Sequence, residues 1–133
     1  MPRGRCNPRG PPFRDGPLDA SEVVDVVRQA CAAVGAAHRA GIVHRDLKPE
    51  NIFLTSGARP LVKVLDFGVA RPIDVAACSE ADLLAAGTPR FMSPEQLFDP
   101  ESTSARSDLF SLGAVAYFAL TGAPPFASET LEG

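Results

Sequence analysis

The feature that most constrains the fold is a helical segment, Asp108–Thr121, which is apolar almost all round. Gly122 and the pair Pro124-Pro125 follow it and are expected to end the helix. A helix without a polar face must be buried by other parts of the protein. The remaining elements therefore have to pack around this helix, and any side left uncovered predicts an exposed apolar patch that favours aggregation.

An earlier segment, from Leu18 to Ala40, has the pattern of an amphipathic helix. Asp19 and Glu22 have the spacing of a capping box, and Leu18 and Val23 have that of a hydrophobic staple. Gly41 stands where a left-handed C-terminal cap is expected. Apolar residues recur at helical spacing and predict one buried face: Val23, Val26, Val27, Ala30, Val34 and Ala37.

Two short apolar runs, Ile52–Leu54 and Leu61–Leu65, flank a turn rich in serine, glycine and proline. This arrangement predicts a small β-hairpin. The segment from Val69 to Pro94 has only weak periodicity, so we expect an extended loop with a helical turn around Glu80–Ala86. A loop of that length in a compact domain usually serves the function.

Composition places the chain among soluble globular proteins. The formal net charge of −3 over 133 residues points to no polyanionic partner. Residues 1–17 are rich in proline, glycine and arginine, and we interpret them as an irregular or disordered, solvated tail rather than a contact for nucleic acid or membrane. We recognise neither a secretory signal nor an apolar stretch long enough to span a membrane, so we expect a soluble product.

Three cysteines, Cys6, Cys31 and Cys78, lie far apart and form no CxxC or Cys/His cluster. This spacing argues against a zinc site and against a disulfide framework. It fits a reducing compartment, and we expect a cytoplasmic protein. Cys31 falls near the apolar stripe of the first predicted helix, so we interpret it as a small core residue.

The residues that carry chemistry are concentrated in a polar loop, His44–Asn51. It holds an acid, Asp46, a lysine two residues later, Lys48, and an amide five residues later, Asn51. Asp66 enters from the far strand of the predicted hairpin, so it can come close to Asn51. A carboxylate and an amide oxygen suit magnesium that is held partly by phosphates. Phosphoryl transfer needs such a set: a group that orients the incoming hydroxyl, a cation beside the transferred group, and magnesium on the phosphates.

Several motifs occur in a fixed order along the chain. The loop His44–Asn51 matches the H-R-D-L-x-x-x-N signature of protein kinases, and Asp66-Phe67-Gly68 matches their D-F-G signature. Ser93-Pro94-Glu95 stands where A-P-E is expected. Further segments complete the series: Gly87-Thr88-Pro89, Ser107–Gly113 and Gly122–Phe126. One short motif is weak evidence, but the ordered series is specific. From about Leu18 to Phe126, the chain resembles bacterial serine/threonine protein kinases of the eukaryotic-like kind.

The resemblance implies a fold and a set of roles. We expect an α+β, protein-kinase-like fold in truncated form, with residues 18–133 as a partial kinase domain: a mainly helical C-lobe fragment with a small β-hairpin. Asp46 would orient the substrate hydroxyl and accept its proton, and Lys48 would lie beside the transferred phosphate of ATP. Asn51 and Asp66 would bind Mg²⁺. The implied cofactors are ATP and Mg²⁺, and the implied partner is a protein substrate with a serine or threonine, without nucleic acid.

The resemblance also implies supporting roles. Thr88 would contact the catalytic loop and help to select a hydroxyl substrate, unless it is an ordinary turn residue. His44 and Phe67 would belong to the internal hydrophobic stack. Asp108 would anchor the catalytic loop backbone, or cap its helix, or both. Glu95 pairs in the family with an arginine near the end of the domain. The chain stops before such an arginine, so an exposed glutamate in the first turn of a helix gains weight.

Regulation is partly readable from the same loop. Arg45, beside the catalytic aspartate, suggests an activation loop that phosphorylation orders through arginine contacts. Ser79 is the sole hydroxyl residue between Gly68 and Gly87 and is the candidate acceptor, but a solvated loop serine is the stronger interpretation.

The sequence departs from the family at its two ends. No glycine-rich loop and no V-A-I-K-like strand precede Leu18, and the chain stops at Gly133, just past the apolar helix. We therefore expect a fragment whose isolated form has negligible kinase activity. One alternative is a non-catalytic kinase remnant or pseudokinase that acts as a binding or regulatory module. A small-molecule phosphotransferase is the other, and Ser93-Pro94-Glu95 and Ser107–Gly113 disfavour it.

Overall fold

A computed structural model of the chain describes residues 13, 16–67, 79 and 88–126. Its helices and strands follow one another in this order: α1 (Ala20–Arg39), β1 (Ile52–Leu54), β2 (Val62–Val64), α3 (Pro94–Phe98) and α4 (Ala105–Thr121). The described residues also form three short 3-10 turns: η1 (Pro49–Asn51), η2 (Thr88–Phe91) and η3 (Pro100–Ser102). The expected α+β content, mainly helical with one hairpin, is confirmed. In these ranges, no helix is long and apolar enough to cross a membrane.

Some predictions fall outside the described residues. The helical turn expected around Glu80–Ala86 is one of them, as is most of the loop from Val69 to Pro94. The irregular tail over residues 1–17 is another, apart from its last two residues and Phe13. The ring of Phe13 contacts that of Phe118 edge to face, with 5.9 Å between the ring centroids.

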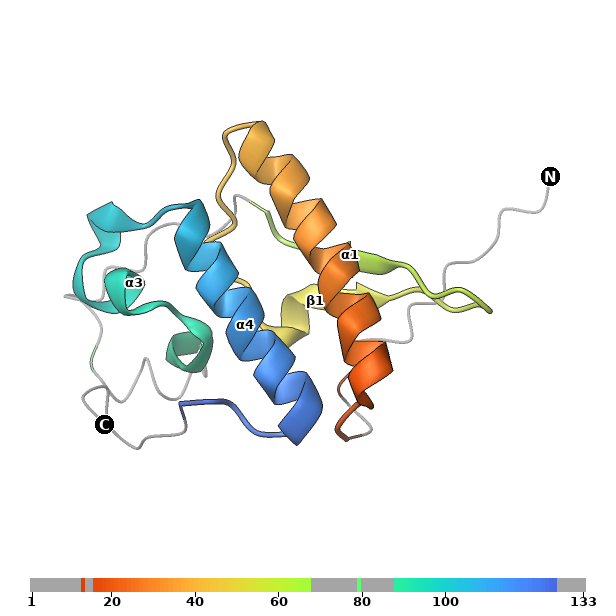
Figure 1. The fold of residues 1–133 in the computed structure, drawn as a ribbon. Helices are drawn as coiled ribbons and strands as arrows, with labels where there is room; N and C mark the ends of the chain where they lie inside the picture. Colours follow the sequence, from red (N-terminus) through yellow and green to blue (C-terminus); the bar gives the residue numbers. More distant parts are fainter. Residues whose placement is uncertain (1–12, 14–15, 68–78, 80–87, 127–133) are drawn as a thin grey trace.

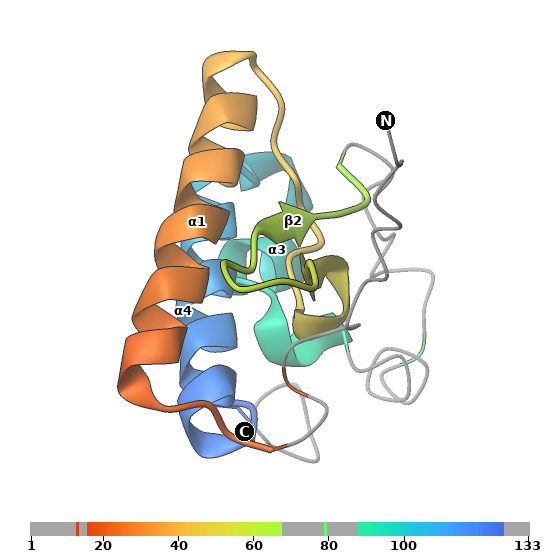
Figure 2. The ribbon, with the colours of Figure 1, turned by 90° about the vertical axis from the view of Figure 1, so that its right-hand side faces the viewer.

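The core lies where α1, α4 and the hairpin meet. In Figure 1, α4 lies between α1 and α3, and Figure 2 shows the hairpin beside α1, on which it packs through β2. Apolar side chains from all these parts form one cluster: Val26, Ala30, Val34, Leu47, Ile52, Phe91, Leu112, Ala114 and Val115. The predicted apolar stripe of α1 is thus the face that covers α4.

Both ends of α1 have the caps that the sequence predicts. The side chain of Asp19 accepts a hydrogen bond from the Glu22 N–H at 2.9 Å, and the Glu22 carboxylate accepts one from the Asp19 N–H at 3.1 Å. At the other end, Gly41 has a φ of +78° and the Ile42 N–H donates to the Ala37 carbonyl at 2.9 Å. This is the left-handed reversal that glycine favours, and it turns the chain from α1 into the polar loop.

Cys31 is exposed, so its interpretation as a core residue is wrong. Its neighbour Ala30 is the buried one, with 1% of its surface exposed. One residue advances the direction around a helix by about 100°. That step carries position 31 off the buried face.

The predicted hairpin is confirmed, with a second strand shorter than expected. β1 and β2 pair antiparallel, with Ile52 opposite Val64 and Leu54 opposite Val62. Leu61 precedes β2, where its N–H donates to the Thr55 hydroxyl at 2.8 Å. Ile52 is fully buried and ties the hairpin to the core.

α4 begins at Ala105, three residues before the predicted start. The Ser104 side chain accepts a hydrogen bond from the Arg106 N–H at 3.3 Å and so caps the helix. The first turn is polar, and for that reason the apolar pattern alone placed the start too late. Asp108 lies one turn inside the helix and is not its N-cap.

One side of α4 is not covered in the described part of the chain. Leu112, Val115 and Ala119 are buried, as expected for an apolar helix. Leu109, Tyr117 and Leu120 are exposed by 56%, 49% and 48%. The predicted exposed apolar surface is therefore present.

Candidate active site

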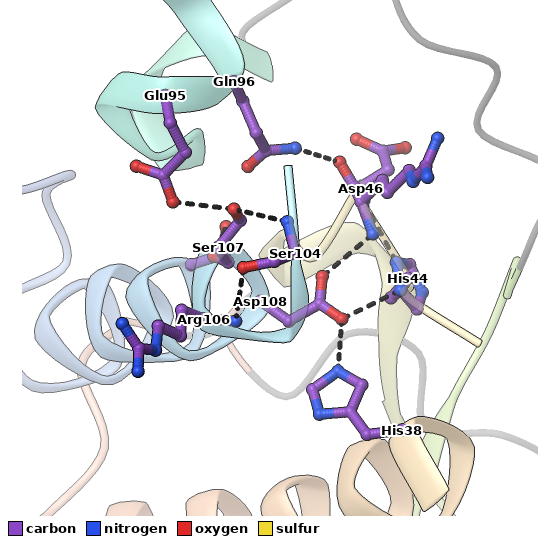
Figure 3. Close-up of polar contacts among 11 residues, drawn as sticks. His38, His44, Asp46, Glu95, Gln96, Ser104, Arg106, Ser107 and Asp108 are labelled. Atoms are coloured by element: carbon purple, nitrogen blue, oxygen red, sulfur yellow. Dashed lines mark hydrogen bonds and ion pairs between the residues drawn. The ribbon is translucent and has the colours of Figure 1, made fainter. Parts of the chain in front are cut away.

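The polar loop after α1 is held by one buried carboxylate. Asp108 is 1% exposed, and its two oxygens accept hydrogen bonds from consecutive backbone N–H groups of the loop. Its Oδ2 lies 2.8 Å from the nitrogen of His44, and its Oδ1 lies 2.9 Å from the nitrogen of Arg45. Figure 3 shows this arrangement. The expected anchor of the loop backbone is confirmed.

His38 is a third partner of this carboxylate and was not predicted. Its Nε2 lies 2.7 Å from Asp108 Oδ2, and its side chain is 17% exposed (Figure 3). Since an ionised carboxylate only accepts hydrogen bonds, the Nε2 atom carries the proton. The two residues are 70 positions apart, and no local pattern pairs them. Asp108 thus joins the end of α1, the loop and the start of α4.

Arg45 has a backbone conformation that is rare for a residue with a side chain, with a φ of +72°. Such a conformation persists only where its surroundings hold it. The Arg45 N–H donates a hydrogen bond to Asp108, and the Arg45 carbonyl oxygen accepts one from the Gln96 amide nitrogen at 2.8 Å. Gln96 was not singled out from the sequence, although Ser93 and Gln96 have the spacing of a capping box.

The His44 ring supports the loop from inside. It is fully buried, and its Nδ1 accepts a hydrogen bond from the Asp46 N–H at 3.1 Å. Nε2 therefore carries the ring proton and donates it to the Leu65 carbonyl at 2.7 Å. The ring also contacts Phe67, with 4.6 Å between centroids. This ring contact is consistent with the expected place of His44 and Phe67 in one internal stack.

Three of the predicted site residues lie together. Lys48 Nζ is 3.3 Å from Asp46 Oδ2, and the two side chains are 24% and 27% exposed. The Asn51 side-chain nitrogen donates to the Asp46 carbonyl at 2.8 Å and lies 3.4 Å from its Oδ2. Asn51 is buried, whereas Asp46 is only partly covered. The Asp46 carboxylate is thus contacted by Lys48 and Asn51, and the rest of it is partly exposed to solvent.

Asp66 lies two residues after β2, at the end of the hairpin where Asn51 precedes β1. The Leu65 N–H donates to the Asn51 carbonyl at 2.8 Å, which places the residue before Asp66 beside Asn51. Asp66 itself is exposed and has a left-handed φ of +62°. Its carboxylate and the Asn51 amide oxygen are hard oxygen donors of the kind that Mg²⁺ prefers. Over the described ranges, no group of three or more His, Cys, Asp or Glu could hold a metal ion.

Of the two interpretations of Glu95, the exposed glutamate in the first turn of a helix is wrong. It is half-buried in the first turn of α3, and its Oε1 accepts a hydrogen bond from the Ser107 hydroxyl at 2.7 Å (Figure 3). This hydrogen bond lowers the pKa of the Glu95 carboxyl below its ordinary value. Ser107 of α4 is thus a partner of Glu95 that the sequence did not predict. The side chain of Thr88 lies outside the part that the structure describes.

Comparison with known proteins decides the family. The model of the protein kinase domain matches residues 9–132, which is nearly the whole chain. The chain belongs to the protein kinase family. It is 49% identical over 117 residues to the serine/threonine-protein kinase Pkn1 of Myxococcus xanthus, which is 86% of this chain and 17% of that protein. It is 42% identical over 116 residues to the serine/threonine-protein kinase PknB of Mycobacterium leprae, which is 87% of this chain and 18% of that protein.

These relatives confirm the predicted resemblance to bacterial serine/threonine kinases. The chain spans less than a fifth of the length of either relative. The kinase family as a whole works with ATP, a divalent metal and protein substrates. In the described loop, the lysine Lys48 and the amide Asn51 both contact the acid Asp46.

Proposed function

We propose that this chain carries the catalytic loop of a protein serine/threonine kinase, which transfers the γ-phosphate of ATP to a hydroxyl of a protein. One observation carries the proposal. Lys48 and Asn51 both contact Asp46, on a loop whose backbone N–H groups donate to the buried Asp108. A mere turn would not need a buried carboxylate, a strained residue and a lysine–aspartate pair in one place.

Asp46 acts as the group that orients and deprotonates the substrate hydroxyl. Its Oδ2 is held by Lys48 at 3.3 Å, and Asn51 fixes its backbone carbonyl at 2.8 Å. The partly exposed carboxylate can therefore meet an incoming hydroxyl in one fixed orientation and take its proton as the new P–O bond forms. Lys48 then stabilises the charge on the transferred phosphoryl group.

Asn51 and Asp66 are the proposed ligands of Mg²⁺. The amide nitrogen of Asn51 is turned toward Asp46, so its oxygen is the atom that remains for a cation. When bound, the ion neutralises charge on the phosphate oxygens of ATP. The position of Asp66 directly after Leu65, which donates to Asn51, supports this pairing.

The remaining parts of the proposal follow from the same assignment. Residues 18–133 would form the kinase portion, after an irregular segment over residues 1–17. The acceptor would be a serine or threonine of a protein, and the reaction would take place in the cytoplasm, where ATP is available. Ser79, which is exposed, would be the phosphorylated residue if the activation loop is regulated in this way.

A transfer assay tests the proposal against its alternatives. The protein at its full natural length is incubated with γ-labelled ATP, Mg²⁺ and a protein acceptor, and the labelled amino acids are then identified. We expect phosphoserine and phosphothreonine, and their loss in Asp46→Asn. No transfer under any condition would favour a non-catalytic remnant or pseudokinase. Label on an aminoglycoside-like small molecule alone would favour a small-molecule phosphotransferase.

A further inference from the structure

Gln96 links α3 to the catalytic loop through a buried hydrogen bond. The residue is 7% exposed, and its Nε2 donates to the Arg45 carbonyl oxygen at 2.8 Å (Figure 3). At the other end of the same amide, Oε1 accepts from the Ser93 N–H at 3.2 Å and from the Ser93 hydroxyl at 3.3 Å. The Gln96 oxygen thus binds the N-cap residue of α3, and the Gln96 nitrogen binds the backbone of the catalytic loop.

The bond to Gln96 acts on the peptide unit that leads into Asp46. The carbonyl of Arg45 and the N–H of Asp46 belong to one planar peptide group. The Gln96 amide binds the oxygen of that group, and the His44 ring binds its N–H at 3.1 Å. Since Arg45 is held in a strained conformation, with a φ of +72°, loss of either bond frees this plane to rotate.

We propose that Gln96 is a positioning residue for Asp46 and that it makes the geometry of the catalytic carboxylate depend on the start of α3. This inference rests on the proposed kinase function. Ser93 forms the cap of α3, its bonds to Gln96 set the orientation of the Gln96 amide, and the amide fixes the peptide before Asp46. A displacement of Ser93 is therefore transmitted to Asp46 without a contact to ATP or to the metal site.

Two substitutions separate the loop contact from the cap. Gln96→Glu keeps an acceptor for Ser93, because glutamate serves the capping box as well as glutamine does. It has no donor for the Arg45 carbonyl, so a carboxylate oxygen faces a carbonyl oxygen. Gln96→Met has similar length but loses both contacts. Gln29→Met is the matched control, because the Gln29 amide also joins two backbone groups, the Pro60 carbonyl at 3.3 Å and the Val62 N–H at 3.0 Å, away from the loop.

The first measurement is steady-state phosphate transfer by the protein at its full natural length. We expect Gln96→Glu and Gln96→Met to lower kcat on the order of 10- to 100-fold and to leave KM for ATP nearly unchanged, since the carboxylate is displaced while the nucleotide contacts remain. Gln29→Met should retain the wild-type kcat. Equal kcat in all four proteins would overturn the positioning role.

A second measurement needs no activity and keeps the two proposals distinguishable. Hydrogen exchange of the Asp46 amide should accelerate on the order of tenfold or more in both Gln96 variants, because the peptide plane that carries it is released. It should stay unchanged in Gln29→Met. If the Asp46 amide exchanges alike in all proteins, the positioning role is wrong even where transfer is observed. If exchange responds but no protein transfers phosphate, the kinase function fails while the contact stands.

Discussion

The hydrogen bonds of Asp108 give the sharpest structural prediction. Replacing Asp108 with asparagine keeps the shape of the side chain but exchanges one acceptor oxygen for a donor. With the oxygen at the Oδ2 position, the bonds from His44 and His38 remain and the amide nitrogen faces the Arg45 N–H, which is 2.9 Å away. In the flipped orientation the Arg45 bond remains and two donors face the amide nitrogen. At least one buried donor loses its acceptor either way.

The loss of stability in Asp108→Asn can be estimated from the one or more buried donors that lose their acceptor. A buried N–H without an acceptor costs about 1–3 kcal/mol, and hydrogen bonds to a neutral acceptor are weaker than those to a charged one. The local free energy that holds the loop closed should therefore fall by about 2 kcal/mol or more in Asp108→Asn. Because about 1.36 kcal/mol corresponds to a factor of ten, exchange of the protected amides should accelerate at least about 30-fold.

Amide hydrogen exchange read at His44 and Arg45 is the assay, since these two residues donate to Asp108 through their backbone N–H groups. Asp25→Asn is the matched control, because Asp25 also accepts hydrogen bonds from two side chains but lies exposed on α1. We expect the control to leave both amides unchanged. Wild-type exchange rates at both His44 and Arg45 in Asp108→Asn would show that Asp108 does not hold the loop backbone.

Three further predictions concern other parts of the molecule. Lys48→Ala should lower kcat by about 10²-fold or more in the transfer assay, because the lysine that contacts Asp46 also stabilises the transferred group. Glu95 has a lowered pKa through its bond from Ser107, so its contribution to stability is present above its unfolded pKa and is lost as pH falls through the lower folded value. Acid unfolding should therefore show the wild type losing stability relative to Glu95→Gln as pH falls below the ordinary value of 4.5. Gly41→Ala should destabilise the fold by about 1 kcal/mol, seen as a lower thermal midpoint, because alanine is strained at a φ of +78°.

Each of these predictions has a contrary outcome. An unchanged kcat in Lys48→Ala would remove the lysine from the transfer step. A stability difference between wild type and Glu95→Gln that is independent of pH would mean that the Ser107 bond does not favour the ionised carboxylate. An equal or higher thermal midpoint in Gly41→Ala would show that the reversal after α1 does not need its left-handed residue.

The sequence predicts local structure well where a particular residue type satisfies a local requirement of the backbone, such as a hydrogen-bond acceptor or a left-handed φ at a helix end. Asp19 and Glu22 specify the start of α1, and Gly41 specifies its end, because a cap is made within a few residues. The hairpin follows in the same way from two apolar runs around a turn. The start of α4 was placed too late because its first turn is polar and Ser104 caps it before the apolar pattern begins.

Contacts between distant segments are what the sequence does not reveal by itself. The resemblance to kinases placed Asp108 beneath the loop, but nothing in the local pattern pairs it with His38, 70 residues away. Gln96 lies in a recognisable capping box, yet its bond to Arg45 depends on how α3 docks on the loop. The burial of Cys31 was predicted wrongly for a local reason. It is adjacent in sequence to the buried Ala30, but on the helix it lies outside the buried face and is exposed.

The most direct test of the proposed roles is a Mg²⁺ titration of labelled-phosphate transfer. It compares the wild type, Asp46→Asn and Asp66→Asn in the protein at its full natural length. We predict that Asp46→Asn loses at least about 10²-fold in rate at every Mg²⁺ concentration, because it lacks the proton acceptor. Asp66→Asn should instead shift half-saturation to higher Mg²⁺, because one metal ligand is weakened. Full activity in Asp46→Asn, or an unchanged Mg²⁺ requirement in Asp66→Asn, would contradict the account.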